Sequence, residues 1–550
     1  MPIKSHRPNL TVKEGNILDW IFPIDSEPSD KPLWLDAGNS SLSLSPKQLV
    51  PWVKRLGFGL QRLGLKPGDT LLVFTPNHIF VPVAYLGTVC VGVAFSGASP
   101  AFTVNELVYQ IKTVAPKVFL VHPALVGTAL PAAAQAGVPK DHIYLISDQE
   151  NAPVQGLKDW RSIMGTSEEV KNWRWPALTK EESRKQVAIV NFSSGTTGLP
   201  KGVSVTHSNI IWNVEQIASI FGFAPTERWL NFLPLYHAYG QAFAVLIAAR
   251  YDISVYVMKA FQLDEYLRLI RHHRITRLHI VPPVMVMLSK RPKEAGCDLS
   301  SVREILCGAA PLSRDLHREM ELRFGVRITQ AWGMSETMCG VSAVPTELAP
   351  PIGSVGVIFP QSEVMIVDDE GKEVPVGERG ELYVRGPQVA AGYWKNPEAT
   401  EATFGGGWLK TGDVGVINED GFMWIVDRKK ELIKVNGLQV SPAELEMTLI
   451  ENPDIEDAAV VRFDLPTGEV PRAYIKVASA AVGRLKPSDV QDWIEPRVAK
   501  HKWLKGGVVF VPEIPKLMSG KIQRKVLREW SARDLQAIEG TGMGDGRVKL

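Results

Sequence analysis

The chain has 550 residues, more than one hydrophobic core usually serves, so we expect two or more domains. Its 61 basic and 59 acidic residues nearly cancel, which gives no bulk electrostatic reason to expect nucleic acid or an anionic membrane as a partner. Scattered cysteines, and the lack of an apolar run of about 20 residues, predict a soluble protein with reduced thiols in a reducing compartment.

The N-terminal part of the chain alternates helical and strand patterns. Residues 45–64 carry apolar side chains at three-to-four spacing, which predicts a helix, and residues 70–77 form a short apolar strand pattern. A helix pattern over 79–92 and a helix–strand pair over 103–121 follow. Strand patterns return at residues 186–192, 274–283 and 301–312. Apolar strands alternating with helices predict a parallel sheet in an α/β domain.

Two later segments have a different character. Residues 352–386 contain strand-length runs separated by glycine turns, which predicts a β-rich subdomain. The last 120 or so residues are enough for one small α+β domain. Within them, Ser441 can cap a helix, Pro442 suits its first position, and Glu444 can complete a capping box.

Residues 191–202, NFSSGTTGLPKG, follow an apolar strand pattern, and we call them the phosphate loop. Successive backbone N–H groups in a glycine-rich loop can hold an anion, and the hydroxyl groups and Lys201 add donors and a positive charge. The spacing of Lys201 excludes a Walker loop, and a dinucleotide-binding GxGxxG pattern is also absent. The loop composition alone leaves open an unliganded surface loop.

Residues 193–203, SSGTTGLPKGV, resemble the signature of the adenylate-forming superfamily, which includes acyl-CoA synthetases, 4-coumarate:CoA ligases, firefly luciferase and peptide-synthetase adenylation domains. The other blocks of that superfamily follow in order: LPLYHAYG, CGAAPL, QAWGMSET, GWLKTGDVG, DRKKELIKVNGLQVSPAELE and PKLMSGKIQRK. The chain is most similar to 4-coumarate:CoA ligase-like enzymes. The resemblance implies an α/β adenylation domain with doubly wound parallel sheets and a β-rich subdomain over residues 1–427, and a small mobile α+β domain over 428–550.

The resemblance also implies the reaction. A carboxylic acid and ATP give acyl-AMP and pyrophosphate, and CoA then gives the thioester and AMP, with Mg²⁺ as the metal ion. The expected partners are a small-molecule acid, ATP and CoA, with no nucleic acid and no membrane span, in a monomer or homodimer. Two alternatives stay open. In the first, the chain forms the adenylate but the acceptor is a carrier-protein phosphopantetheine or, as in luciferase, oxygen. In the second, the chain is a non-catalytic nucleotide-binding module.

The resemblance assigns catalytic roles to four residues. Lys521 resembles the C-terminal lysine that joins carboxylate and α-phosphate oxygens, and Glu336 resembles the Mg²⁺ ligand. His237 resembles the histidine near the acyl carboxylate, and Thr197 belongs to the phosphate loop.

A larger set resembles the nucleotide site of the family. Asp413 corresponds to the carboxylate that accepts both ribose hydroxyls, Arg428 supports it, and Trp332 lines the adenine site. The phosphate loop is expected to hold the leaving β- and γ-phosphates. The full nucleotide set is Ser193, Ser194, Gly195, Thr196, Thr197, Gly198, Lys201, Ala309, Gln330, Ala331, Trp332, Ser335, Asp413 and Arg428.

The acyl group is expected to lie among His237, Tyr239, Ala309, Ala331 and Met338. Ala331 and Met338 are bulkier than the glycines common in 4-coumarate ligases, so they should reshape a planar aromatic slot. No aspartate stands where amino-acid-activating domains hold the substrate ammonium group. The sequence therefore favours a mostly apolar acid, aryl or medium-chain.

The CoA-facing surface and the hinge resemble the family less closely. Lys430 corresponds to the hinge, and Lys434, Gly437 and Gln439 correspond to the thioester-forming face. Asn436 replaces a lysine that is usual in plant aryl ligases, which should weaken contact with CoA phosphates. A basic residue expected directly before Phe261 is also displaced by one position, to Lys259.

The two ends of the sequence bear on localisation. The first twenty residues have no apolar core like that of a signal peptide, so we expect a cytoplasmic protein. The last three residues, Val548, Lys549 and Leu550, nearly match the Ser-Lys-Leu peroxisomal signal, so peroxisomal import is the alternative.

Overall fold

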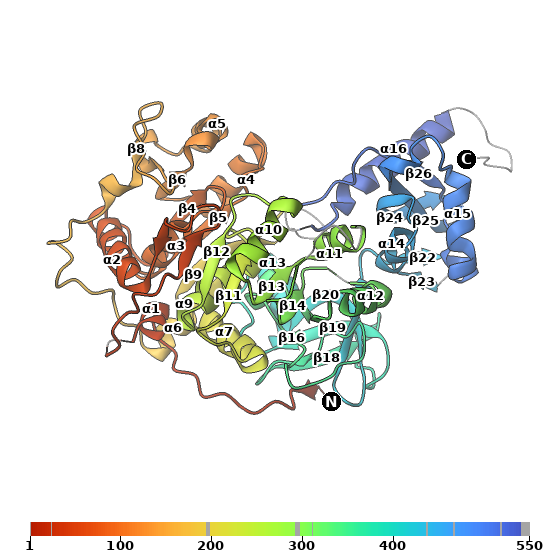
Figure 1. The fold of residues 1–550 in the computed structure, drawn as a ribbon, viewed down its shortest axis with the longest axis horizontal. Coiled ribbons are helices and arrows are strands. Elements are labelled where there is room, and N and C mark those ends of the chain that lie inside the picture. Colours follow the sequence, from red (N-terminus) through yellow and green to blue (C-terminus); the bar gives the residue numbers. More distant parts are fainter. Residues whose placement is uncertain are drawn as a thin grey trace.

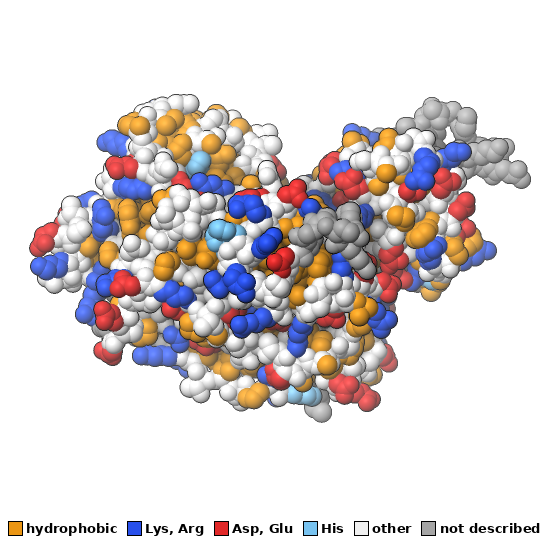
Figure 2. Space-filling model, viewed as in Figure 1, with side chains coloured by type: hydrophobic (Ala, Val, Ile, Leu, Met, Phe, Trp, Pro, Cys, Tyr) orange, Lys and Arg blue, Asp and Glu red, His pale blue; other side chains and the backbone are white. Residues whose placement is uncertain are grey.

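The computed structural model describes residues 2–23, 25–193, 199–291, 298–310, 312–435, 438–465, 468–517 and 520–540, with side chains as far as residue 536. The chain forms a large lobe and a smaller C-terminal lobe, which is drawn in blue in Figure 1. Acidic and basic side chains are interspersed on both lobes, and a notch separates the lobes along the upper edge of Figure 2. No helix in the described part of the chain is long and apolar enough to span a bilayer.

A seven-stranded sheet lies in the N-terminal half of the large lobe, and all its strands except β10 pair in parallel. Its strands, in spatial order, are β10 (Lys201–Thr206), β9 (Val187–Ser193), β5 (Ala94–Ala98), β4 (Thr70–Phe74), β6 (Val118–Val121), β7 (Ile143–Leu145) and β8 (Lys158–Asp159).

Helices cover both faces of this sheet. Alternate residues of β4 belong to different cores: Leu71 and Val73 pack in the core that includes residues of α2 (Pro46–Arg62) and α3 (Val81–Val89). Leu72 and Phe74 pack with residues of α4 (Val104–Val114) and α5 (Val126–Ala136). Successive strand side chains point to opposite faces, so the sheet is doubly wound, which confirms the predicted α/β class.

A nine-stranded sheet forms the centre of the large lobe. Its strands, in spatial order, are β17 (Val357–Ile358), β16 (Ser342–Ala343), β15 (Arg327–Trp332), β14 (Glu304–Cys307), β13 (Arg277–Ile280), β11 (Arg228–Asn231), β12 (Ser254–Val257), β2 (Trp34–Asp36) and β3 (Ser43–Leu44). The strands from β15 to β2 are parallel. Helices α7 (His207–Phe221), α10 (Leu263–His273), α11 (Pro282–Ser289) and α12 (Arg314–Phe324) accompany it.

The β-rich subdomain predicted for residues 352–386 is confirmed, because this segment contains strands in the structure. β18 (Glu363–Val367) and β19 (Gly380–Arg385) belong to an antiparallel five-stranded sheet with β1 (Ile3–Lys4), β20 (Leu409–Ile417) and β21 (Met423–Arg428). This sheet brings Asp413 of β20 opposite Arg428 of β21.

The C-terminal lobe has its own apolar core, which is built mainly from residues 433–504. It contains the pair β22 (Ile433–Val435) and β23 (Leu438–Val440), and a three-stranded sheet of β24 (Ile455–Leu465), β25 (Gly468–Val477) and β26 (Val508–Phe510). Its helices are α14 (Pro442–Ile450), α15 (Pro487–Ile494) and α16 (Arg524–Gly540).

The predicted start of α14 is right in one part and wrong in another. Ser441 Oγ accepts from the backbone N–H of Glu444, as a helix cap should. The reciprocal capping-box bond is not formed, because the Glu444 carboxylate binds Lys502 instead. The Ser441 hydroxyl in turn donates to Asp427 across 2.6 Å, which links the helix to the end of β21.

Candidate functional site

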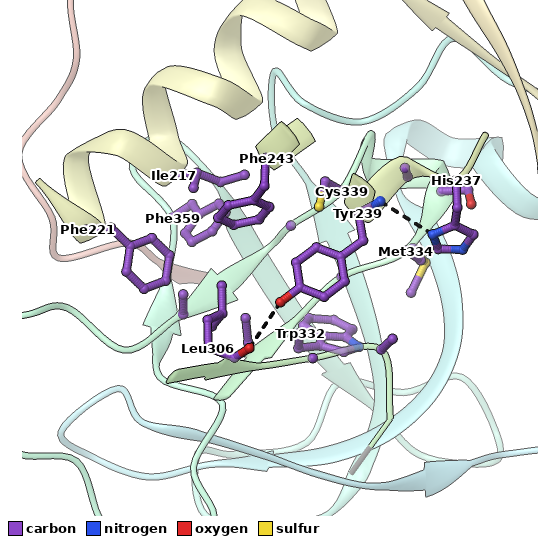
Figure 3. A pocket seen from close by; sticks show the side chains of 18 of the residues that line it. Ile217, Phe221, His237, Tyr239, Phe243, Leu306, Trp332, Met334, Cys339 and Phe359 are labelled. Atoms are coloured by element: carbon purple, nitrogen blue, oxygen red, sulfur yellow. Dashed lines mark hydrogen bonds between the residues drawn. The ribbon is translucent and has the colours of Figure 1, made fainter. Parts of the chain in front are cut away.

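An elongated cavity opens beside the carboxyl ends of β14 and β15, where ligands usually bind in open α/β sheets (Figure 3). Helix α7, the π-helical segment Gln241–Ile247 and the segment that follows β17 supply its other walls. Its lining residues are Ile217, Phe221, His237, Ala238, Tyr239, Phe243, Leu306, Gly308, Ala309, Ala331, Trp332, Gly333, Met334, Ser335, Cys339, Gly340, Ala343, Phe359 and Lys521.

His237 and Lys521 bring polar groups to this cavity. His237 Nδ1 accepts from the backbone N–H of Tyr239 across 3.4 Å, so a proton on the neutral ring sits on Nε2. Burial, and then the neighbouring Lys521, lower the pKa of His237 to about 4. Burial and Arg428 lower the pKa of Lys521, against the attraction of Asp413 and Glu336. His237 is therefore neutral at physiological pH and can donate one hydrogen bond into the cavity.

The far end of the cavity is apolar. Figure 3 shows Tyr239 between His237 on one side and Ile217, Phe221 and Phe359 on the other. The Tyr239 hydroxyl donates to the backbone oxygen of Leu306 across 3.2 Å, so its proton is not free to bind a ligand. Burial raises the pKa of Tyr239 well above its usual value, which keeps the phenol neutral. This end of the cavity suits an apolar group without a charge.

Asp413 lies at the meeting point of two sheets. Its Oδ2 accepts from Trp332 Nε1 across 2.7 Å, and its Oδ1 pairs with Arg428 Nε at 2.5 Å. The carboxylate is buried, and burial raises its pKa more than Arg428 and the indole bond lower it. Three residues of the predicted nucleotide set are thus in direct contact.

Glu336 belongs to a second polar group. Its Oε1 accepts from the Tyr393 hydroxyl across 2.9 Å, and Lys201 Nζ lies 4.7 Å from the centre of the Tyr393 ring. Burial and the Glu336 carboxylate raise the pKa of Tyr393. Lys201 starts β10 opposite Ser193, the last residue of β9, so both described ends of the phosphate loop lie beside this group.

Other predicted residues lie elsewhere or outside the described residues. Gln330 uses its side chain on protein partners, accepting from Leu312 N and contacting His317 Nδ1, and it does not line the cavity. Ala309, Ala331 and Ser335 do line it. Ser194, Gly195, Thr196, Thr197 and Gly198 of the phosphate loop, Gly437 and the last ten residues lie outside the described residues, so the roles predicted for them stay predictions.

Met338 is fully buried, but it is not among the residues that line the cavity. Its backbone has φ +61° and ψ −55°, and Cys339 N donates to Thr337 O across 2.6 Å. These values describe a γ-turn with positive φ, a rare and strained conformation for a residue with a side chain. The turn directs Cys339 into the cavity, directly after the segment that carries Glu336.

Of the residues predicted for the CoA face and the hinge, those that the structure describes do not line this cavity either. Lys434 is exposed on β22, and its backbone N–H donates to Glu469. Gln439 Nε2 donates to Asp369 across 3.3 Å. Lys430 follows β21 by two residues. Their roles in CoA binding and in the hinge stay predictions.

Several functional candidates escaped sequence reasoning. Tyr393 stands in QVAAGYW, a segment with no charged residue to attract attention, and its role depends on reaching Glu336. Ile217 and Phe221 stand one turn apart on α7, a spacing that is equally typical of ordinary core residues. Phe359 completes the apolar end from a part of the chain 138 residues later than Phe221. Only the fold brings these side chains together.

Residues 26–394 match the AMP-binding enzyme family, and residues 444–521 match the AMP-binding enzyme C-terminal domain. The predicted boundary at residue 427 falls between the two matches and stays a prediction. The phenylacetyl-CoA ligase epaB of Aspergillus niger is 34% identical over 95% of this chain and 98% of its own length. The 4-coumarate–CoA ligase 1 of Solanum tuberosum is 34% identical over 96% of each chain.

A solved structure agrees over nearly the whole chain. The ATP-bound MatB from Rhodopseudomonas palustris superposes with a TM-score of 0.82 and 27% identity, over 94% of this chain and 98% of that chain. These matches cover both lobes and confirm the resemblance that the sequence blocks indicate. The chain belongs to the AMP-binding enzyme family, the adenylate-forming superfamily that contains the acid–CoA ligases.

Proposed function

We propose that this AMP-forming acid–CoA ligase activates an apolar carboxylic acid, aryl or medium-chain, whose tail occupies the far end of the cavity. The observation that carries the proposal is the continuity of one cavity from Lys521 and His237 to Phe221 and Phe359. A charged tail would lose its hydration there without gaining a charged partner, since the side chains that line that end are apolar and the Tyr239 hydroxyl donates its proton to Leu306.

Lys521 and His237 act in different ways on the carboxylate group of the substrate acid. The Lys521 ammonium group neutralises charge while the acid oxygen approaches the α-phosphate, because the two anions otherwise repel each other. His237 donates from Nε2 and orients the acid, since its Nδ1 is held by Tyr239 N. Asp413 accepts the ribose hydroxyl groups, with Arg428 and Trp332 fixing its orientation.

Glu336 fits a Mg²⁺ ion. Magnesium is usually held by one or two carboxylates together with substrate phosphates rather than by a full protein cage. Glu336 offers one carboxylate, and its Oε1 accepts a hydrogen bond from the Tyr393 hydroxyl. Among the described residues, no group of three or more His, Cys, Asp or Glu side chains could hold a metal ion without the nucleotide. When bound with ATP, the ion would neutralise phosphate charge. Lys201, beside Tyr393, adds a cation for the leaving phosphates.

A panel of acids tests the proposal. The chain is incubated with ATP, Mg²⁺, CoA and either benzoate, phenylacetate, 4-coumarate, hexanoate, decanoate or a dicarboxylate, and the products are identified by mass spectrometry. We expect acyl-CoA and AMP with at least one acid that has an apolar tail, and the dicarboxylate to be the poorest substrate. A preference for the dicarboxylate would contradict the proposal.

The same panel separates the alternatives. Acyl-AMP that accumulates without acyl-CoA would indicate a different acceptor, such as a carrier-protein phosphopantetheine supplied by another chain. Nucleotide binding without pyrophosphate release from any acid would indicate a non-catalytic module.

A further inference from the structure

Helix α11 contacts the C-terminal lobe through the residue at its C-terminal end. Lys290 directly follows the helix, and its ammonium group donates to the backbone oxygens of Ile455 and Glu456, the latter across 3.0 Å. Ile455 is the first residue of β24, the strand that forms the long hairpin of this lobe with β25. A single lysine of the large lobe therefore holds the start of that hairpin, and Figure 1 shows α11 on the side of the large lobe that faces this lobe.

The other end of α11 supports the segment that carries Lys521. Gly520 has φ +80°, and a Cβ atom placed on it would lie only 3.0 Å from Cγ of Pro283. Pro283 stands in the first turn of α11. The backbone at Gly520 can pass so close to the helix only because glycine has no side chain and tolerates positive φ.

A short series of contacts connects the two segments of the C-terminal lobe that touch the two ends of α11. Asp457, next to Glu456, binds Lys516 Nζ at 2.6 Å. Lys516 and Ile522 form a β-bridge, and Leu517 N donates to Lys521 O across 2.9 Å. The two backbone oxygens that Lys290 holds therefore belong to the two residues directly before Asp457, the carboxylate that binds Lys516.

Lys290 is partly buried at this contact. Burial lowers the pKa of Lys290, Asp457 and Glu456 attract its ammonium group and oppose that effect, and Lys516, itself paired with Asp457, repels it. A hydrogen bond in which one partner is charged is stronger than a bond between two neutral groups. The contact is thus a specific anchor between the lobes.

We propose that Lys290 is a positioning residue for adenylation: by anchoring Ile455 and Glu456 it holds the C-terminal lobe where Lys521 lines the acyl cavity. The proposal rests on the proposed function, because it assigns Lys521 to the attack on the α-phosphate. In thioester formation the thiol of CoA loses its proton to solvent, a carbon–sulfur bond forms, and the acyl–phosphate bond breaks to release AMP. Lys521 has no assigned role in that step. Lys290 should therefore matter for one half-reaction only.

The test compares the two half-reactions in Lys290→Met, which keeps most of the side-chain length without the charge. With the best acid of the panel, we expect the kcat of acid-dependent ATP–pyrophosphate exchange to fall about five- to tenfold, with KM for ATP and acid nearly unchanged. The rate of thioester formation from the corresponding synthetic acyl-AMP and CoA should stay at the wild-type value. Lys290→Arg, which keeps the charge and the donors, should restore exchange.

Lys476→Met is the matched control, because Lys476 pairs with Glu456 and Glu513 inside the C-terminal lobe. We expect both of its half-reactions to run at wild-type rates. Equal losses of both half-reactions in Lys290→Met, or no loss in either, would overturn the proposal for Lys290 alone. If the wild-type chain shows no exchange with any acid, both this proposal and the proposed function are overturned.

Discussion

The indole N–H of Trp332 donates to Oδ2 of Asp413 across 2.7 Å, so the end of β15 is tied to the middle of β20. The two strands belong to different sheets, and Trp332 also lines the cavity. One side chain thus forms a wall of the cavity proposed for the acyl group and holds the carboxylate predicted to bind the ribose. This relationship makes the bond a direct target for mutation.

Trp332→Phe keeps an aromatic ring but removes the donor to Asp413. We expect KM for ATP in the exchange assay to rise about tenfold, since a hydrogen bond to a buried charged group contributes about 1.5–3 kcal/mol. Trp424→Phe is the control, because Trp424 Nε1 is buried without a partner in the described part of the chain. An equal rise of KM in both variants would show that the bond to Asp413 is not the cause.

Tyr393→Phe keeps the ring beside Lys201 and removes only the hydroxyl that donates to Glu336. Without this donor the carboxylate is less fixed, so we expect the exchange rate to fall about tenfold and the Mg²⁺ concentration for half-maximal rate to rise. Titration of Mg²⁺ at saturating ATP measures both effects, with Tyr383→Phe on β19 as the control. An unchanged Mg²⁺ dependence would separate Tyr393 from metal binding.

Phe221→Leu shortens the wall at the apolar end of the cavity, far from His237 in Figure 3. We expect the ratio of kcat/KM for a larger acid over a smaller one to increase about tenfold, the range that such pocket changes give. Phe223→Leu is the control, since Phe223 stacks on Phe221 at 5.9 Å but does not line the cavity. The same ratio in wild type and Phe221→Leu would mean that the acyl tail does not reach this wall.

Met338→Gly and Met338→Ala remove the same buried side chain and leave a similar cavity, but only glycine relieves the positive φ of the γ-turn. We therefore expect the glycine variant to be more stable than the alanine variant by about 1–2 kcal/mol, the reverse of the usual order. Urea unfolding of both variants measures the difference. A more stable alanine variant would mean that the turn carries no strain.

We expect the buried side chain of His207 to make the folded protein less stable at acid pH. Its Nδ1 accepts from Ile17 N across 3.2 Å, its Nε2 is buried without a described partner, and burial lowers its pKa to about 3 from 6.5. A pKa that is lower in the folded state means that unfolded chains take up the proton first, so stability is full above pH 6.5 and falls toward pH 3. At pH 5.5 the loss for this group is about 1.4 kcal/mol.

His207→Asn should therefore lose less stability than wild type between pH 7.5 and 5.5, as measured by urea unfolding at each pH. His272→Asn, at an exposed position, is the control and should behave as wild type. A wild-type slope in His207→Asn would assign the acid sensitivity to other groups.

The elements that local sequence determines were predictable. The pattern over residues 45–64 corresponds to α2, and the apolar run at 70–77 contains β4, because period and capping residues are local signals. The blocks that carry Asp413, Arg428, Trp332 and Lys521 were recognisable for the same reason, since each keeps its own short motif.

The contacts between distant segments were not predictable. Glu336 and Tyr393 are separated by 57 residues, and no periodicity relates them. Gln330 stands in a recognisable block, yet its amide is taken up by Leu312 and His317, which only the packing of α12 against β15 determines. The capping box at Glu444 failed likewise, because Lys502 from a later segment is the stronger partner of the carboxylate.

Among the described residues that line the cavity, Lys521 alone comes from the C-terminal lobe. Under the proposed function, the residues that select the acid and the lysine that promotes its attack on ATP therefore lie in separate parts of the chain. Substitutions in the walls would then change which acid is accepted while Lys521 remains untouched. Recombination between related genes at the junction of the lobes would then transfer the acid preference with the first part of the chain. Related enzymes could in this way acquire new substrates while Lys521 stays in place.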